Sequence, residues 1–131
     1  MSYTIDKRVE GEFDEVIDRT ADALSAEGFG ILSDIDVQQT FKKKLDEEFR
    51  QYRILGACNP SLAREALEEE LQLGTLLPCN VVVYETDGGE IGVSAVDPTV
   101  MLAVADNPEL DSIAVDVRER FERVLDELPE A

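Results

Sequence analysis

Histidine and tryptophan are absent from this chain, and only two cysteines are present. Without histidine the sequence cannot supply a Ser-His-Asp triad, a Cys-His pair, an HExxH zinc site or a histidine-ligated haem. Cys58 and Cys79 are too few for a disulfide framework, and a reducing cytosol would keep them as thiols. The common histidine-dependent hydrolase and metal chemistries are therefore excluded, and no metal site is predicted.

Long apolar runs and phosphate-binding loops are also absent. The longest unbroken apolar run, 100–105, has six residues, whereas crossing a bilayer takes about 20. The first residues alternate like a strand and lack the apolar core of a signal peptide. No GxxxxGK[ST] loop or GxGxxG fingerprint occurs. We therefore expect a cytoplasmic protein of one domain, 1–131, that neither spans nor inserts into a membrane.

Basic residues are scarce. Thirty acidic residues stand against twelve basic ones, which gives a net charge of −18. A field of this sign repels nucleic acids and anionic membranes, so neither is expected as a partner. Such acidity is typical of halophilic proteins, whose charged surfaces stay soluble in concentrated salt. A basic protein partner is the alternative explanation.

Hydrophobic periodicity predicts alternating strands and helices. Five strands are expected, at 3–9, 29–37, 51–58, 76–85 and 90–97, the last two joined by the Asp87-Gly88-Gly89 turn. Helices are expected after each of the first three strands, and a long one after Asn107-Pro108. We expect an α+β two-layer sandwich, in which a mainly antiparallel sheet of about five strands has helices on one face.

Some details of this expectation are specific enough to be checked. The residues Leu110, Ile113, Val117, Phe121, Leu125 and Leu128 should face inward from the long helix. The short helix after Asp36 should have an inner face of Val37, Phe41, Leu45 and Phe49. In the second strand, residues 29, 31, 33, 35 and 37 should share one face. Both sides of the final hairpin are apolar, which favours a dimer or a pocket on the uncovered face.

One stretch, 38–64, is net basic in this acidic chain. It includes Lys42, Lys43 and Lys44, three of the four lysines. An anionic ligand would find its counter-charge here, with Lys42 and Lys44 as candidates. The alternative is a solvated helix face.

Each cysteine precedes an asparagine, in Cys58-Asn59-Pro60 and in Cys79-Asn80. If Asn59 caps the next helix, the Cys58 thiol lies beside the positive end of the helix dipole, which stabilises a thiolate. Alternatively, both cysteines are small buried hydrophobic residues. Asp97, which precedes Pro98, either caps a helix or supplies a carboxylate to the same end of the sheet.

The ordered motifs Gly28-Phe29, Ile35-Asp36-Val37, Phe41-Lys42, Ile54-Leu55-Gly56-Ala57-Cys58-Asn59-Pro60, Leu76-Leu77-Pro78-Cys79-Asn80-Val81 and Asp97-Pro98 resemble the domain of unknown function 302 family. That resemblance implies a curved antiparallel sheet of the TATA-box-binding-protein-like type, β-α-β(4)-α, and usually a homodimer. It implies no reaction and no DNA binding, because function resides in the site and not in the fold. It directs attention to Lys42, Lys44, Cys58, Asn59, Cys79, Asn80 and Asp97.

These residues leave three functions open, and whether the chain is an enzyme stays undecided. The first is the binding of a small anionic or thiol-reactive ligand near Cys58 and Asn59, with Lys42 or Lys44 neutralising charge. The second is thiol-redox or soft-metal handling by Cys58 and Cys79. The third is a dimeric structural or regulatory module without a ligand. No particular cofactor is indicated.

Overall fold

A five-stranded antiparallel sheet with the strand order β1-β5-β4-β3-β2 organises the molecule. The structure, a computed structural model, describes residues 2–131. The strands are β1 (Thr4–Val9), β2 (Gly30–Asp36), β3 (Tyr52–Cys58), β4 (Cys79–Glu85) and β5 (Ile91–Val96). The α-helices are α1 (Phe13–Ala26), α2 (Val37–Leu45), α3 (Pro60–Glu69), α4 (Pro98–Met101) and α5 (Asp111–Asp126), and the short 3-10 helices are η1 (Leu71–Leu76), η2 (Leu102–Ala105) and η3 (Pro108–Leu110).

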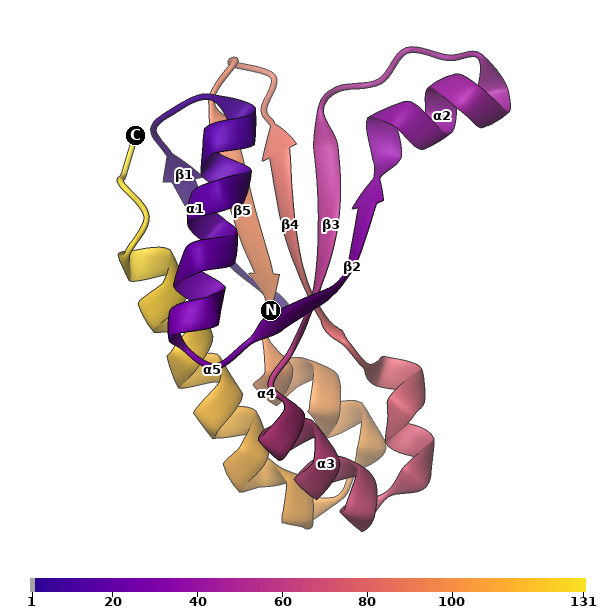
Figure 1. Cartoon of the computed structure of the whole chain (residues 1–131). Coiled ribbons are helices and arrows are strands. Elements are labelled where there is room, and N and C mark those ends of the chain that lie inside the picture. The colour runs from indigo at the N-terminus through magenta and orange to yellow at the C-terminus, as the bar shows by residue number, and fades with distance from the viewer. Residues whose placement is uncertain (1) are drawn as a thin grey trace.

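Helices α1 and α5 lie together against one face of the curved sheet, and α3, η1 and α4 extend beyond one end of the strands (Figure 1). The α+β two-layer sandwich expected from the sequence is therefore confirmed. None of the helices in residues 2–131 has both the length and the apolar character that a membrane crossing requires.

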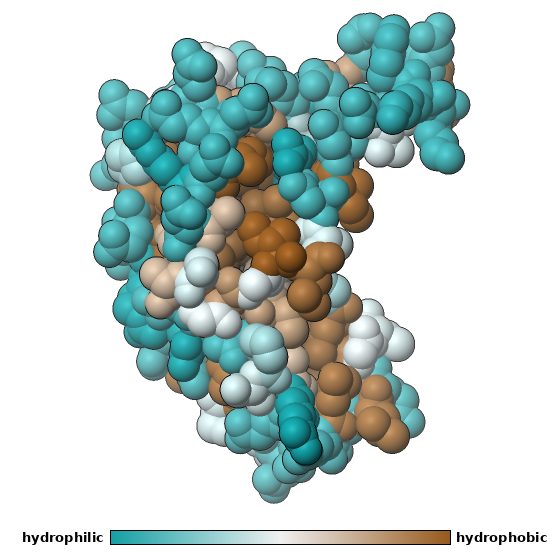
Figure 2. All heavy atoms as spheres, viewed as in Figure 1, coloured by the Kyte–Doolittle hydropathy of each residue, from teal (hydrophilic) through white to brown (hydrophobic). Residues whose placement is uncertain are grey.

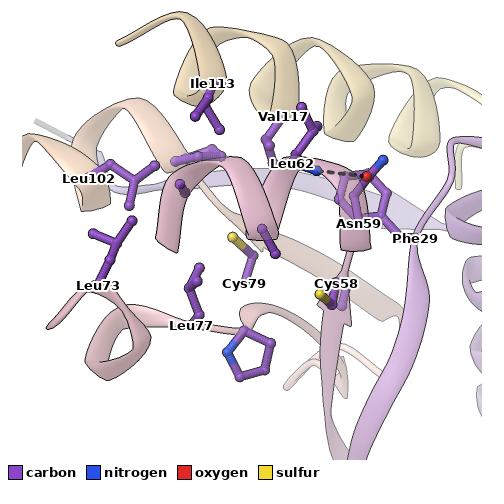
Figure 3. Close-up of a pocket in the computed structure, with 15 residues that line it drawn as sticks. Phe29, Cys58, Asn59, Leu62, Leu73, Leu77, Cys79, Leu102, Ile113 and Val117 are labelled. Atoms are coloured by element: carbon purple, nitrogen blue, oxygen red, sulfur yellow. Dashed lines mark hydrogen bonds between the residues drawn. The ribbon is translucent and has the colours of Figure 1, made fainter. Parts of the chain in front are cut away.

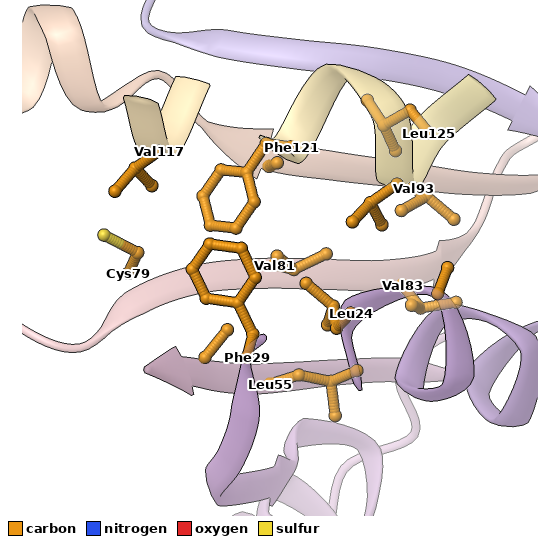
Figure 4. Close-up of a cluster of buried hydrophobic side chains, with 14 of the residues drawn as sticks. Leu24, Phe29, Leu55, Cys79, Val81, Val83, Val93, Val117, Phe121 and Leu125 are labelled. Atoms are coloured by element: carbon orange, nitrogen blue, oxygen red, sulfur yellow. The ribbon is translucent and has the colours of Figure 1, made fainter. Parts of the chain in front are cut away.

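The core lies between α1, α5 and the covered face of the sheet (Figure 4). Phe121 of α5 is fully buried and packs on Phe29, with their ring centroids 4.9 Å apart. All six residues expected to face inward from 110 to 128 are buried, as their helical spacing predicted.

The β4–β5 hairpin also follows the prediction. The pairs Val81↔Ala95 and Val83↔Val93 point into the core, and Val82↔Ser94 points to the uncovered face. Each of these pairs shares a face because successive strand residues alternate between the two faces. The fourth expected strand begins later than predicted, at Cys79, because 71–76 form the 3-10 helix η1.

The expectation that alternate residues 29–37 share one face of β2 is wrong. A register shift between Ile31 and Ser33 pairs Ile31 with Ala57 and Ser33 with Gly56. Ile31 consequently packs against the core, whereas Ser33 lies on the uncovered face. A β-bulge inserts one residue, and this reverses every later side chain.

The prediction of an inner face on the helix after Asp36 is also wrong. Helix α2 begins at the Asp36 cap, as expected, but none of its residues is buried. It projects from the β2–β3 end of the sheet, away from the other helices (Figure 1). We call 37–51, which comprises α2 and the segment leading into β3, the arm. Leu45 and Phe49, expected to be inside, are 58% and 40% exposed.

The face of the sheet opposite α1 and α5 is not covered by any element of residues 2–131. Between the arm and the lobe formed by α3 and η1 the molecule bends inward, and hydrophobic atoms line the inside of this bend (Figure 2). The exposed hydrophobic side chains include Leu32, Ile35 and Leu71.

Candidate functional site

Cys58 and Cys79 come together at the end of the sheet next to α3. Cys58 is the last residue of β3, and Cys79 is the first residue of the antiparallel strand β4. In that register Cys79 lies opposite Ala57, the neighbour of Cys58. An antiparallel pairing of strands therefore brings together two cysteines that have twenty residues between them in sequence.

Asn59 begins α3 as the sequence predicts. Its side-chain oxygen accepts a hydrogen bond from the backbone N–H of Leu62 at 3.2 Å, and Pro60 occupies the first helical turn. This cap leaves Cys58 directly before the helix N-terminus, where backbone N–H groups carry partial positive charge.

A cavity of about 40 Å³ lies between these residues and the helices beyond the sheet (Figure 3). Its lining is almost entirely apolar, so it suits a small apolar group. The lining residues are Phe29, Ala57, Cys58, Asn59, Leu62, Ala63, Ala66, Leu73, Leu77, Pro78, Cys79, Pro98, Leu102, Ile113 and Val117.

The two thiols differ in their surroundings. Cys79 is buried, and this burial, with a smaller contribution from the nearby Cys58, raises the pKa of its thiol to about 11. Cys58 is only partly buried, and both cysteines are free. Cys79 is therefore a protonated core thiol at neutral pH, and Cys58 is the accessible one.

Cys58 also borders an open groove on the outer side of α3. The other residues of this groove, which we call the α3 groove, are Pro60, Ala63, Arg64, Leu67, Glu68 and Leu71. Cys58 and Ala63 line both spaces, so they lie between the groove and the cavity.

Asn80 does not join this group. It lies opposite Gly56 on the uncovered face, because it is the neighbour of Cys79 in a strand whose side chains alternate. Of the two Cys-Asn pairs, only the first contributes both side chains to the cavity.

Lys42 and Lys44 lie on α2 in the arm, at the other end of the β3 strand from Cys58 (Figure 1). Lys42 pairs with Glu48 at 3.0 Å and Asp46 at 3.2 Å, within the arm itself. No lysine lines the cavity or the α3 groove. Within one chain, the expected neutralisation of a ligand at Asn59 by these lysines is therefore not seen.

Asp97 is a buried cap and an ion-pair partner. It accepts hydrogen bonds from the backbone N–H and the hydroxyl of Thr99, at 3.0 and 2.6 Å, and it pairs with Arg118 of α5. Burial alone would raise the pKa of this carboxyl, but the Thr99 and Arg118 hydrogen bonds outweigh burial, so the pKa is lowered. Asp97 holds α4 and α5 to the end of β5, and it does not line the cavity.

A second concave region lies on the uncovered face. We call it the hollow, and it is lined by Tyr3, Thr4, Asp6, Tyr52, Asn80, Val82, Tyr84, Ser94 and Val96. A row of aromatic rings leads into it from the arm, with centroid distances of 5.0 Å for Phe41–Phe49, 6.3 Å for Phe49–Tyr52 and 5.8 Å for Tyr52–Tyr84. The sequence indicated an apolar second side of the hairpin, but not this row, because Phe41 and Phe49 were placed in the core.

Among residues 2–131, no three cysteine or carboxylate side chains gather in a way that would hold a metal ion. The polar chemistry near the cavity is limited to the two thiols and the capping amide of Asn59.

The fold and the site define a class: an α+β protein with one uncovered sheet face and a thiol-lined apolar cavity at the strand ends. The chain belongs to the family described as domain of unknown function DUF302, whose model matches residues 5–128. A crystal structure of an uncharacterized conserved DUF302 protein from Bacillus stearothermophilus is similar, with 30% sequence identity and a TM-score of 0.91. That similarity covers 98% of this chain and 99% of the other. No curated protein matches the chain.

Proposed function

We propose that this protein binds a small thiol-reactive molecule that enters through the α3 groove and reaches Cys58. The observation that carries the proposal is that Cys58 lines both an open groove on α3 and an apolar cavity at the strand ends. The groove offers an approach to Cys58, the residue lies directly before the N-terminus of α3, and the cavity leaves space beside it for a small apolar group.

If the ligand is anionic, the cationic side chain nearest to it lies on the α3 groove itself. It is not one of the lysines that the sequence suggested. Arg64, which lies on the α3 groove with Cys58, is 83% exposed and pairs with Glu68 at 3.0 Å. An anionic ligand in the groove would compete with Glu68 for this guanidinium. Lys42, Lys44, Asn80 and Asp97 are not part of the proposed site.

Alkylation with iodoacetamide near neutral pH tests this proposal. The Cys58 sulfur displaces iodide to form a C–S bond, and the thiol proton passes to solvent. We expect mass spectrometry to find the label on Cys58 in the folded protein, and on Cys79 only after unfolding. Ala63→Leu places a larger side chain beside Cys58 and so restricts access from the groove. It should slow the labelling several-fold.

Ser61→Leu is the matched control, because Ser61 is an exposed residue of α3 that lines neither space. It should leave the labelling rate unchanged. A Cys58 that stays unlabelled until the protein unfolds would refute the proposed site. Equal rates in the Ala63→Leu and Ser61→Leu variants would show that the groove is not the route.

The thiol-redox alternative is less well supported. A disulfide between Cys58 and Cys79 needs one thiolate to attack an oxidised partner. With its pKa near 11, Cys79 is protonated at neutral pH, and the sulfur of Cys79 points away from Cys58 (Figure 3). Soft-metal binding by the same pair would need further ligands, and none gathers here among residues 2–131.

We also propose that the protein forms a homodimer through its uncovered sheet face. The arm has no buried residue in α2, and exposed Ile35, Leu45 and Phe49 lie on or next to it. Hydrophobic atoms also line the inside of the bend beside the arm (Figure 2), and exposed apolar surface is typical of protein interfaces. Sedimentation velocity at several protein concentrations tests this, and a monomer at every concentration would contradict it.

The acidity is proposed to be an adaptation to concentrated salt in a halophilic cytoplasm. In support, acidic residues outnumber basic ones over most of the chain, and α2, with three lysines and no acidic residue, is an exception. The free energy of unfolding should then rise as KCl is raised toward molar concentration, because screening weakens the repulsion between carboxylates. A stability that is independent of salt would contradict this explanation.

A further inference from the structure

The arm and the hollow form one continuous surface. Phe49 of the arm contacts Tyr52, and Tyr52 stacks on Tyr84 within the lining of the hollow. A surface that carries both a projecting element and a concave one can match a copy of itself across a two-fold axis.

The arm and the hollow each carry charged side chains that have no ion-pair partner within the described chain. Those on the arm are positive and the one in the hollow is negative. Helix α2 has three lysines and no acidic residue. Lys43 and Lys44 form no ion pair with any residue in 2–131. In the hollow, the Asp6 carboxylate accepts a hydrogen bond from the Thr4 hydroxyl at 3.0 Å but has no cationic partner within the same range.

We propose that the arm of one copy docks in the hollow of a second copy, and the reverse, so that Lys43 or Lys44 of each chain pairs with Asp6 of the other. This rests on the homodimer proposed above and assigns its interface. Leu45 and Phe49 supply the apolar contact, because both are exposed and belong to the arm. The ion pairs set the register and the choice of partner rather than most of the affinity.

A second copy fits this surface better than other occupants. A nucleic acid is repelled by the net charge of −18. A small cation would satisfy Asp6 but would leave the exposed apolar side chains of the arm in water. A second copy supplies the cation for Asp6 and the anion for the lysines at once, since each chain carries both.

Complementary charge reversal tests the interface. The arm variant Lys43→Glu/Lys44→Glu places acidic residues against Asp6, and the hollow variant Asp6→Lys places a lysine against Lys43 and Lys44 of α2. Each variant alone should be monomeric at protein concentrations where the wild type is dimeric. An equimolar mixture of the two should form a heterodimer, because its two arm–hollow contacts again join opposite charges.

Sedimentation velocity is measured from about 1 to about 100 µM at one salt concentration, the range over which a dimer of micromolar Kd dissociates on dilution. Arg64→Glu, which reverses an exposed charge on α3 far from the arm, is the matched control and should leave the dimer unchanged. Circular dichroism melting curves establish that every variant folds.

Each outcome bears on one proposal or the other. A monomeric wild type overturns the homodimer and this interface together. A wild-type dimer that persists in both charge variants, or variants whose mixture stays monomeric, overturns the arm–hollow pairing and leaves the homodimer standing. Binding of a small amine to the hollow of a monomeric wild type would likewise overturn the docking of a second copy.

Discussion

The two faces of the sheet are formed by the same strands, but one is covered by helices and the other is not. On the covered face, Val81, Val83 and Val93 are almost fully buried beneath α1 and α5. On the other face, the rings of Tyr52 and Tyr84 continue the row that starts at Phe41 in the arm, but no element covers them. The covered face holds the fold together, and the uncovered face is left available for contact. Apolar composition alone therefore does not reveal which side of a strand forms the core.

The largest expected difference between the two faces is in the stability lost when a phenylalanine on each side is replaced by alanine. Phe121→Ala removes a fully buried ring that packs on Phe29, and should lower the free energy of unfolding by about 3 to 5 kcal/mol. Phe49→Ala removes a ring that is 40% exposed, and should cost roughly 1 kcal/mol in the monomer. Urea denaturation of both variants measures the difference, and similar losses would mean that the arm belongs to the core.

An alkaline titration tests the burial of Cys79. Between pH 9.0 and about 11 the unfolded thiol is ionised while the folded thiol keeps its proton. The unfolded state then binds fewer protons, so the free energy of unfolding falls as the pH rises through this window. The full loss is up to roughly 2 to 3 kcal/mol, at about 1.36 kcal/mol per pKa unit.

Cys79→Ala should remove this part of the alkaline loss, whereas Cys58→Ala should retain it. Urea denaturation of the three proteins at a series of pH values from 8 upward supplies the comparison. Parallel curves for all three proteins would show that Cys79 is not a buried thiol.

A smaller effect should follow from adding a methyl group to the uncovered face. A Cβ on Gly92 would lie 2.6 Å from the Tyr84 ring, so Gly92→Ala must displace that ring. We expect a loss of about 1 kcal/mol, the low end for overpacking, because the ring can swing toward solvent.

Gly30→Ala is the matched control, because a Cβ on Gly30 meets no atom within 4 Å. Thermal denaturation compares the two variants. In the proposed dimer, Gly92→Ala should also weaken association, because Tyr84 lines the hollow. An unchanged dimer together with an unchanged melting temperature would mean that the Tyr84 ring is not held over Gly92.

Much of the fold could be predicted because the signals were local. Asn59-Pro60 and Asp97-Pro98 begin helices, and the Asp87-Gly88-Gly89 turn joins β4 to β5, because capping and turn chemistry depends only on neighbours in sequence. The family resemblance was confirmed as well, because the family model matches residues 5–128.

The candidate site was predicted only in part. Cys58, Asn59 and Cys79 meet at one cavity because strands β3 and β4 are antiparallel neighbours. Asn80 and the lysines do not join them, because strand alternation turns Asn80 to the other face and α2 leaves the body of the protein. The bulge after Ile31 gave no signal in the sequence.

By itself the sequence determined the α+β class, the element order, the helix caps and the inward face of α5, because spacing and capping are properties of short segments. Only the tertiary structure decided that Cys58 borders both a groove and a cavity, and that the apolar side chains of the arm do not enter the core. Those outcomes depend on which strands pair and on which elements remain to cover each face. These are long-range packing relations that no short segment contains.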